Sequence, residues 1–184
     1  MKWNVSSLWP AALPFLLAAC SSFPSSSSFD DVCRDSVKVT QQFYDRFIVT
    51  NEFDAYSEEK MSGYSAYLSA ELYQLITDAI RRDKAYLAAN PGNKGRFGDG
   101  VPFYGSADGI SSAKVIAPAK RISSEVNAVT LTLDMRNDRD DIAWRDAVAL
   151  SRASAGSCWQ IDNVIFDEDT NTSSLQDILR DEEE

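Results

Sequence analysis

The sequence contains no histidine in its 184 residues. Histidine supplies the base of Ser-His-Asp and Cys-His catalytic sites, is a ligand in many zinc sites, and titrates near neutral pH. Its absence therefore excludes those two catalytic classes and most zinc sites. Because no other complete catalytic set of residues is present, we expect a protein that is not an enzyme and that binds no cofactor and no metal.

Positive charge is in the minority, with 18 Lys and Arg against 28 Asp and Glu and a net charge of -10. A surface this acidic repels phosphate backbones and anionic lipid head groups. We therefore expect no nucleic-acid partner and no direct membrane binding by the folded domain. Residues 181–184 hold part of the charge and are predicted to be a solvated acidic tail.

Long apolar runs are also missing. Residues 8–19 give about a dozen apolar positions, whereas a membrane-spanning helix needs about 20. With Lys2 before it, this short run is typical of a signal peptide. It ends in Leu17-Ala18-Ala19-Cys20, which resembles the lipobox of bacterial lipoproteins. The resemblance implies that residues 1–19 are removed and that Cys20 is acylated; a chance cysteine after an ordinary secretory signal is the alternative.

A Ser-rich segment, residues 20–29, follows the lipobox and is predicted to be a flexible tether. In enterobacterial lipoproteins an aspartate directly after the lipidated cysteine is associated with retention in the inner membrane, and Ser21 stands at that position here. We therefore expect an outer-membrane lipoprotein on the periplasmic face. The remaining residues 30–180 have the length of one domain.

Only two cysteines, Cys33 and Cys158, remain after Cys20. In an oxidising periplasm an isolated pair is more often a disulfide than two free thiols. A redox-active pair is the alternative, but neither cysteine lies in a Cys-x-x-Cys motif. We therefore predict a disulfide between them.

Three segments predict helices. Apolar residues recur every four positions over residues 35–49, as in a helix with one buried face. Ser69 is predicted to cap the start of a second helix that ends near Leu87. Ser174 is predicted to open a short final helix.

After residue 109 the apolar period changes to two, which predicts strands near residues 113–117, 128–135, 142–150 and 159–166. Helices first and hairpin-connected strands afterwards indicate an α+β fold. We expect N-terminal helices packed on a curved, mostly antiparallel sheet of about four strands, with a short C-terminal helix. This order is similar to the nuclear transport factor two-like cone, in which the glycine-rich residues 90–109 would help to enclose a hollow.

Several short segments, together with the lipobox and the tether, resemble a YbjP-like enterobacterial lipoprotein family. They are Gln41-Gln42-Phe43-Tyr44-Asp45, Tyr67-Leu68-Ser69 and Cys158-Trp159-Gln160-Ile161-Asp162-Asn163-Val164. The resemblance extends from about Cys33 to Leu179, and it implies a disulfide between the matching cysteines and an accessory role in the envelope. It carries over no catalytic residue and names no substrate.

A calcium loop is the first local alternative, because Asp167, Asp169 and Asn171 have the spacing of its opening ligands. The later positions, which need a glycine and a bidentate carboxylate, hold Thr172 and Ile178. We therefore favour a polar strand exit.

The glycines between residues 92 and 100 could in principle cradle a phosphate, with two basic residues between them. A P-loop needs Gly-Lys-Ser/Thr between a strand and a helix, and that context is missing. A flexible connector is favoured. Phe97, Phe103 and Tyr104 in or near this loop are predicted to be core plugs or contacts with a pocket ligand or a partner.

Two carboxylates and two tryptophans on the predicted strands are further candidates. Asp146 and Asp162 could form an acid-base pair across neighbouring strands, although a place at the sheet rim or a pair with a neighbouring arginine is commoner. Trp144 and Trp159 could line a pocket for an apolar ligand. Core packing is the more frequent role of such aromatic residues.

The leading hypothesis is a periplasm-facing, non-enzymatic accessory or adaptor lipoprotein that binds another envelope protein. An immunity lipoprotein that neutralises a periplasmic toxin is a second hypothesis, since an acidic domain suits a basic enzyme. A binder of a small apolar ligand is the third.

Overall fold

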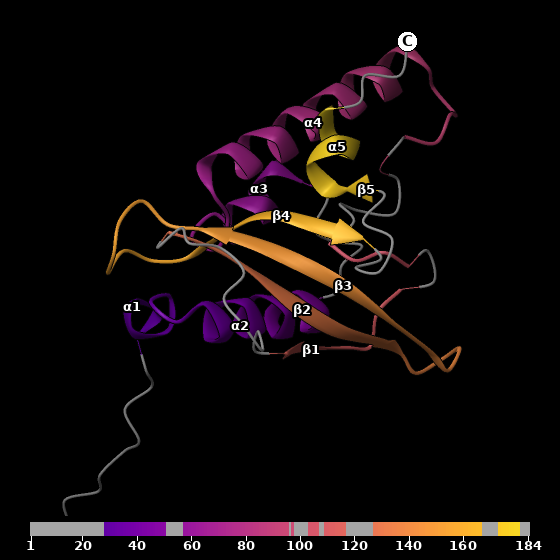
Figure 1. Cartoon of the computed structure of the whole chain (residues 1–184). Coiled ribbons are helices and arrows are strands. Elements are labelled where there is room, and N and C mark those ends of the chain that lie inside the picture. The colour runs from indigo at the N-terminus through magenta and orange to yellow at the C-terminus, as the bar shows by residue number, and fades with distance from the viewer. Residues whose placement is uncertain are drawn as a thin grey trace, which may run out of the picture.

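Five antiparallel strands form one sheet in the order β1-β2-β3-β4-β5, with helices before and after it in the chain (Figure 1). The computed structural model describes residues 28–50, 57–95, 97, 103–106, 109–116, 127–166 and 173–180. The helices are α1 (Phe29–Val32), α2 (Ser36–Val49), α3 (Glu58–Ser62), α4 (Ala70–Ala89) and α5 (Leu175–Arg180), and the strands are β1 (Ser112–Ile116), β2 (Ala128–Asn137), β3 (Ile142–Ser151), β4 (Gln160–Phe166) and β5 (Ser173–Ser174).

The predicted α+β class is therefore confirmed, with helices first, an antiparallel sheet and a short C-terminal helix. The sheet has a fifth strand because the two-residue β5 pairs with the end of β4, Ile165 lying opposite Ser174. A strand of two residues leaves no alternating pattern, which explains why about four strands were expected.

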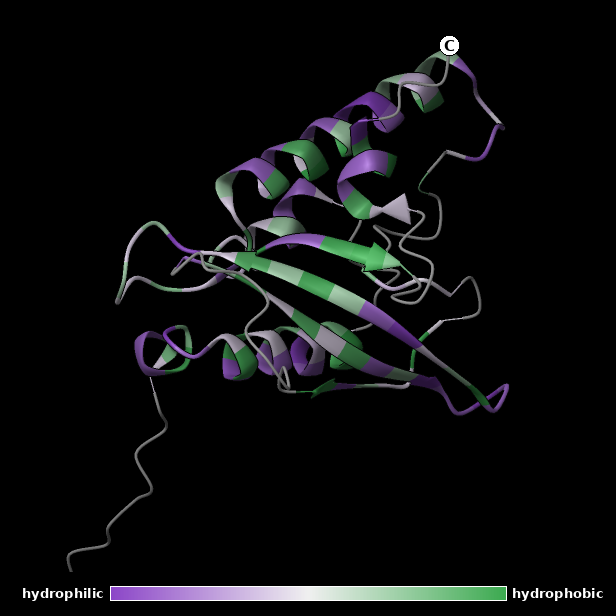
Figure 2. Ribbon diagram, viewed as in Figure 1, coloured by the Kyte–Doolittle hydropathy of each residue, from purple (hydrophilic) through white to green (hydrophobic). Residues whose placement is uncertain are grey.

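Strands β2 and β3 form a long hairpin, from Asn137 opposite Ile142 to Ala128 opposite Ser151. Its tight polar turn, residues 138–141, lies at one end of the sheet, here named the turn end. The loop of residues 152–159 between β3 and β4 lies at the opposite end, here named the disulfide end. In Figure 2 the two strands are hydrophobic along much of their length and hydrophilic near the turn.

Both long helices begin at a side-chain cap, of which Ser69 was predicted. The Asp35 carboxylate accepts hydrogen bonds from the backbone N–H groups of Val37 (3.0 Å) and Lys38 (3.2 Å) at the start of α2. The Ser69 hydroxyl accepts one from the N–H of Leu72 (3.1 Å) at the start of α4. Both contacts satisfy N–H groups that a helix leaves without an internal partner.

Helix α2 packs against the inner face of the sheet. Its apolar stripe, Val39, Phe43 and Phe47, is completely buried. The sheet contributes the alternate residues of its strands, including Leu131, Leu133, Met135, Val148 and Leu150. The helix begins beside α1, below the disulfide end of the sheet, and points towards the turn end (Figure 1).

Two of the segments that resemble the lipoprotein family meet at the edge of β4. Leu68 forms an isolated parallel bridge with Ile161. The N–H of Ile161 donates to the Tyr67 carbonyl (2.7 Å), and the N–H of Ser69 donates to the Ile161 carbonyl (2.8 Å). These residues therefore have a structural role, which is to attach the start of α4 to the sheet.

The predicted disulfide joins Cys33 and Cys158, which are separated by 125 residues in the sequence. Beside it, the N–H of Trp159 donates to the Cys33 carbonyl (2.7 Å), and the Arg152 guanidinium lies 4.3 Å from the centre of the Trp159 ring. The disulfide end thus fastens the first turn of the domain to the sheet.

Several predictions fall outside the described residues: the signal peptide, Cys20, most of the tether, residues 167–172 and the acidic tail. Helix α1 begins at Phe29, which was predicted to be the last residue of the tether. Among the described residues, no helix is both long and apolar enough to cross a membrane.

Candidate functional site

A cluster of aromatic and polar side chains lies on the inner face of the sheet near the turn end. Residues 103–106, here named the strap, lie against α2 and β3 and bring Phe103 and Tyr104 into this cluster. The ring centres of Tyr104 and Trp144 are 6.5 Å apart. Three of the five predicted pocket or partner contacts therefore meet at one place.

Asp146 is the polar centre of the cluster and has no solvent exposure. One of its carboxylate oxygens, Oδ2, accepts a hydrogen bond from the Gly105 N–H (2.7 Å) and another from Trp144 Nε1 (3.0 Å). Hydrogen-bond donors are what a buried carboxylate needs to offset its lost hydration. Asp146 therefore ties the strap to β3.

Phe103 anchors the strap from the other side. Its ring is buried edge-on against Phe43 and Phe47 of α2, with ring centres 5.0 Å and 5.2 Å away. Its backbone carbonyl accepts a hydrogen bond from the Tyr44 hydroxyl (2.9 Å). Phe103 is therefore a core plug on the face of the sheet that α2 covers, which is one of the roles predicted for it.

Tyr44 was not predicted as a site residue, although it lies in one of the segments that resemble the family. Burial raises its pKa well above the ordinary tyrosine value, and the negative charge of Asp146 adds to this effect. The hydroxyl therefore stays protonated and serves as a hydrogen-bond donor. Only the aromatic and polar sequence around it, Gln41–Asp45, gave a signal, and the partner Phe103 is 59 residues away.

The structure does not pair Asp146 with Asp162, which were considered as an acid-base pair but not favoured. Asp162 lies beside the register shift at Ala149 and Leu150, whereas Asp146 precedes Ala147, which is opposite Ile165. The two carboxylates are therefore not opposite one another on β3 and β4. The adjacent Arg145 contacts Asp134 on β2 through its Nε (2.9 Å).

Trp159, the fourth predicted contact, is at the disulfide end. Phe97, the fifth, is buried in the core. The glycine-rich loop is only partly described. Its Gly95 lies so close to Asp83 of α4 that a Cβ there would overlap the carboxylate, which indicates a packed backbone at this point.

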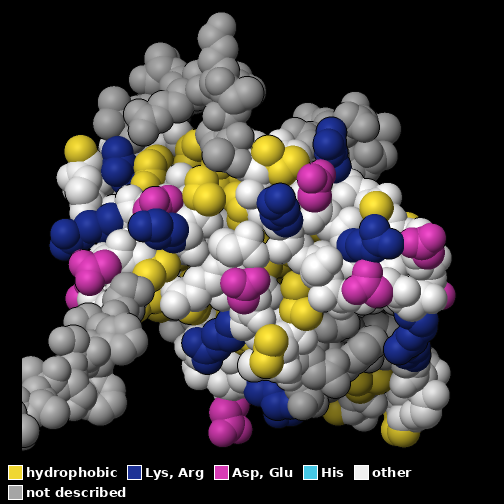
Figure 3. Space-filling view, turned by 90° about the horizontal axis from the view of Figure 1, so that it is seen from below, with side chains coloured by type: hydrophobic (Ala, Val, Ile, Leu, Met, Phe, Trp, Pro, Cys, Tyr) yellow, Lys and Arg dark blue, Asp and Glu magenta, His cyan; other side chains and the backbone are white. Residues whose placement is uncertain are grey.

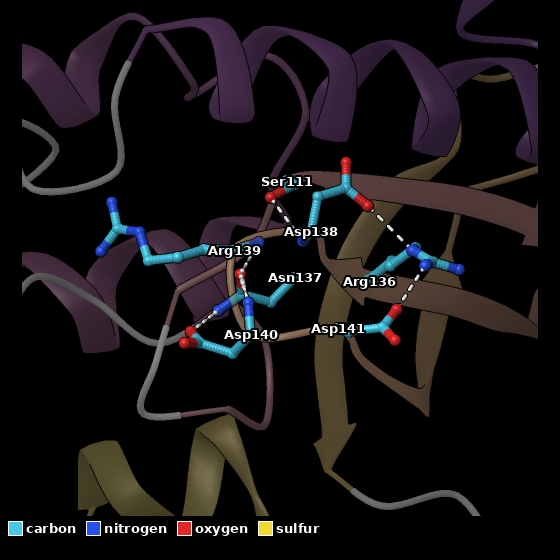
Figure 4. Close-up of polar contacts among 7 residues, drawn as sticks. All are labelled: Ser111, Arg136, Asn137, Asp138, Arg139, Asp140 and Asp141. Atoms are coloured by element: carbon cyan, nitrogen blue, oxygen red, sulfur yellow. Dashed lines mark hydrogen bonds and ion pairs between the residues drawn. The ribbon is translucent and has the colours of Figure 1, made fainter.

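The turn between β2 and β3 is fixed by its own polar side chains (Figure 4). Arg136 donates to Asp138 (2.8 Å) and to Asp141 (2.7 Å), and Asn137 donates to Asp140 (2.8 Å). The Arg139 side chain extends away from these contacts (Figure 4). The turn therefore holds an arginine at the far tip of the hairpin.

Two exposed apolar side chains lie at the end of α2 and at the start of β3. Val49, the last residue of α2, is 84% exposed, and Ile142, the first residue of β3, is 40% exposed. By contrast, the face seen from below has Lys and Arg side chains interspersed with Asp and Glu (Figure 3). The described part of that face shows no block of one charge.

The described residues contain no group of three or more His, Cys, Asp or Glu side chains placed to hold a metal ion. The chain matches no protein-family model, no curated protein and no solved structure. The geometry of the strap, the turn and the disulfide end is therefore what bears on function.

Proposed function

We propose that this chain is a periplasm-facing outer-membrane lipoprotein, anchored through Cys20, that acts as a non-enzymatic accessory or adaptor for another envelope protein. The observation that carries the proposal is the separation of two ends of the sheet. The tether joins one end, where the Cys33–Cys158 disulfide lies. The rigid polar turn lies at the other end.

The disulfide end suits attachment to a membrane. The chain enters the described domain at Ser28, only a few residues before Cys33. The disulfide and the hydrogen bond from Trp159 to Cys33 link this entry point directly to the sheet. A pull on the tether would therefore be resisted by the sheet rather than by α1 alone.

The turn end suits contact with a partner. Strand β3 spans ten residues, which at roughly 3.3 Å per residue places the turn about 30 Å from the disulfide end. Arg139 projects from the tip, and Ile142, which directly follows the turn, exposes apolar surface. Arginine and apolar side chains are frequent at protein interfaces, where lysine and glutamate are depleted.

Photocrosslinking in cells tests the proposal. A photoreactive amino acid at position 139 should give a reproducible adduct with one envelope protein. The matched control is position 155, since Ala155 is exposed in the loop at the disulfide end. Absence of an adduct at 139, or the same adducts at both positions, would count against an adaptor with its interface at the turn.

Membrane fractionation tests the anchor. The variant Cys20→Ala should move from the membrane to the soluble periplasmic fraction, because a lipobox cysteine is the site of acylation. Unchanged membrane association of this variant would contradict anchoring through Cys20.

A further inference from the structure

We propose that the strap is a displaceable plug and that the surface beneath it binds a peptide segment of a partner protein. That segment has an aromatic residue and, two positions later, a glycine. The class of partner, a protein, rests on the proposed function. The chemistry of the segment comes from the contacts that the strap makes. The strap occupies the site in the same chain and so competes with the partner.

Two of the contacts that hold the strap are made by its backbone, as they would be for a bound peptide. Tyr44 on α2 donates to the carbonyl of Phe103 (2.9 Å), and Asp146 on β3 accepts from the N–H of Gly105 (2.7 Å). Neither bond involves a side chain of the strap. Another peptide with the same backbone spacing can therefore make both bonds, which is how main-chain contacts contribute to peptide recognition.

The side-chain requirements follow from the same contacts. The first residue must be aromatic, because the Phe103 ring packs edge-on against Phe43 and Phe47. The third must be glycine, because a Cβ on Gly105 would lie 2.9 Å from Asp146 Oδ1 and 3.4 Å from the Cβ of Phe166. The surface therefore selects an aromatic residue followed, two positions later, by glycine.

Charge restricts the partner further. Asp146 is fully buried, and the whole chain has a net charge of -10. An acidic segment would be repelled, whereas a neutral or basic one presenting an N–H to Asp146 is complementary. The strap sequence, Phe-Tyr-Gly-Ser, contains no acidic residue.

The position of the strap suits displacement. Phe103 is buried, but Gly105 is exposed and Tyr104 is only half-buried, so the strap lies at the surface. It also lies near Trp144, two residues along β3 from Ile142 at the turn end, where the proposed function places the partner. Binding beneath the strap and contact with the turn can therefore involve one partner.

Binding of a synthetic peptide to the full chain, purified from cells, tests the inference. The probe is acetyl-Phe-Tyr-Gly-Ser-amide, and the control peptide has Ala in place of Phe. Gly105→Ala should release the strap, since its Cβ meets the Asp146 carboxylate. The matched variant is Gly63→Ala, whose Cβ meets only the flexible end of Arg46 at 3.0 Å and the Lys60 carbonyl at 3.3 Å.

Gly105→Ala should bind the probe about tenfold or more tightly than the wild type and Gly63→Ala, because removing an internal competitor raises the binding-competent fraction. The control peptide should bind none of the three. Equal or absent binding of the probe by all three proteins, with unchanged circular dichroism, would overturn the inference.

Hydrogen exchange of the wild-type chain provides a test that does not depend on a variant. Amides of residues 103–106 should exchange at least tenfold faster than those of Leu131 and Val148 in the β2–β3 ladder, because a plug opens without global unfolding. Equal rates would show that the strap is an ordinary part of the core.

The crosslinking and peptide-binding experiments separate the two proposals. A crosslink at position 139 without peptide binding would refute only the displaceable plug. Peptide binding without any adduct in cells would refute only the adaptor function.

Discussion

The side chain of Gln41 on α2 makes the hydrogen bonds with Val115 and Ala113 that a neighbouring strand would otherwise make. Its Oε1 accepts a hydrogen bond from the Val115 N–H (2.9 Å), and its Nε2 donates to the Ala113 carbonyl (2.9 Å). Both groups lie on the edge of β1 that does not pair with β2. A side-chain amide on α2 thus closes a sheet edge that could otherwise pair with another chain.

Gln41→Ala should destabilise the domain by about 1–3 kcal/mol, because two partly buried backbone groups of β1 lose their partners. Urea unfolding followed by circular dichroism measures the effect. The matched control is Gln74→Ala on α4, where the lost contact is an exposed one to Asp78, and its effect should stay within about 0.5 kcal/mol. An equal loss of stability in the two variants would show that the hydrogen bonds of Gln41 with β1 stabilise the domain no more than an exposed contact does.

The disulfide should stabilise the domain by about 2–5 kcal/mol, since it closes a loop between residues separated by 125 positions. The variant in which Cys33 and Cys158 are both Ala should unfold at a correspondingly lower urea concentration. A thiol reductant should lower the midpoint of the wild type and leave that of the double variant unchanged. Equal midpoints for the wild type and the double variant would be inconsistent with a disulfide that constrains the unfolded chain.

Tyr44 should make stability fall at high pH. Burial, and secondarily Asp146, raises its pKa in the folded state, whereas an unfolded tyrosine titrates near pH 10. The unfolded state therefore loses its proton first as the pH rises. The stabilisation from Tyr44 is fully present below about pH 10 and decreases above it, by about 1.4 kcal/mol per pH unit.

Urea unfolding from about pH 8 to about pH 11 tests this in the wild type and in Tyr44→Phe. The variant should be less stable by about 1–2 kcal/mol at the lower pH, because the buried Phe103 carbonyl loses its donor. The difference between the two proteins should then shrink above about pH 10. A difference that stays constant over the whole range would show that Tyr44 does not cause the decline.

The parts of the fold that sequence predicts are those that depend on neighbouring residues. Helix α2 follows from a period near four, the Ser69 cap from local hydrogen bonding, and the long hairpin from alternation around a polar turn. Tyr44 with Phe103 and Gln41 with Val115 join residues 59 and 74 positions apart. Such side-chain contacts leave no period in the sequence.

In the candidate site too, the sequence predicted individual residues but not the contacts between distant ones. The aromatic residues of the strap and Trp144 stood out as pocket or partner contacts because large aromatic side chains in a glycine-rich loop and on a strand are conspicuous. Asp146 stood out because it interrupts an apolar strand. One of its partners, the Gly105 N–H, is a backbone group, and no residue type in the sequence marks it.

The backbone of Asp141 constrains the turn that presents Arg139. Asp141 has a φ of 53°, in the left-handed region, which aspartate tolerates but which is a genuine outlier for a β-branched residue. Asp141→Val should therefore destabilise the domain by about 1–2 kcal/mol in urea unfolding. Asp138→Val is the control, because Asp138 loses the same kind of ion pair with Arg136 and is not in the left-handed region.

Exposed ion pairs contribute about 0–1 kcal/mol, so most of the loss in Asp141→Val should be absent from Asp138→Val. Asp141→Gly removes the same carboxylate but adopts a positive φ without strain, and it should stay close to the Asp138→Val control. Equal losses in all three variants would assign the effect to the ion pairs with Arg136. A loss confined to Asp141→Val would show that the left-handed backbone at position 141 stabilises the turn that carries Arg139.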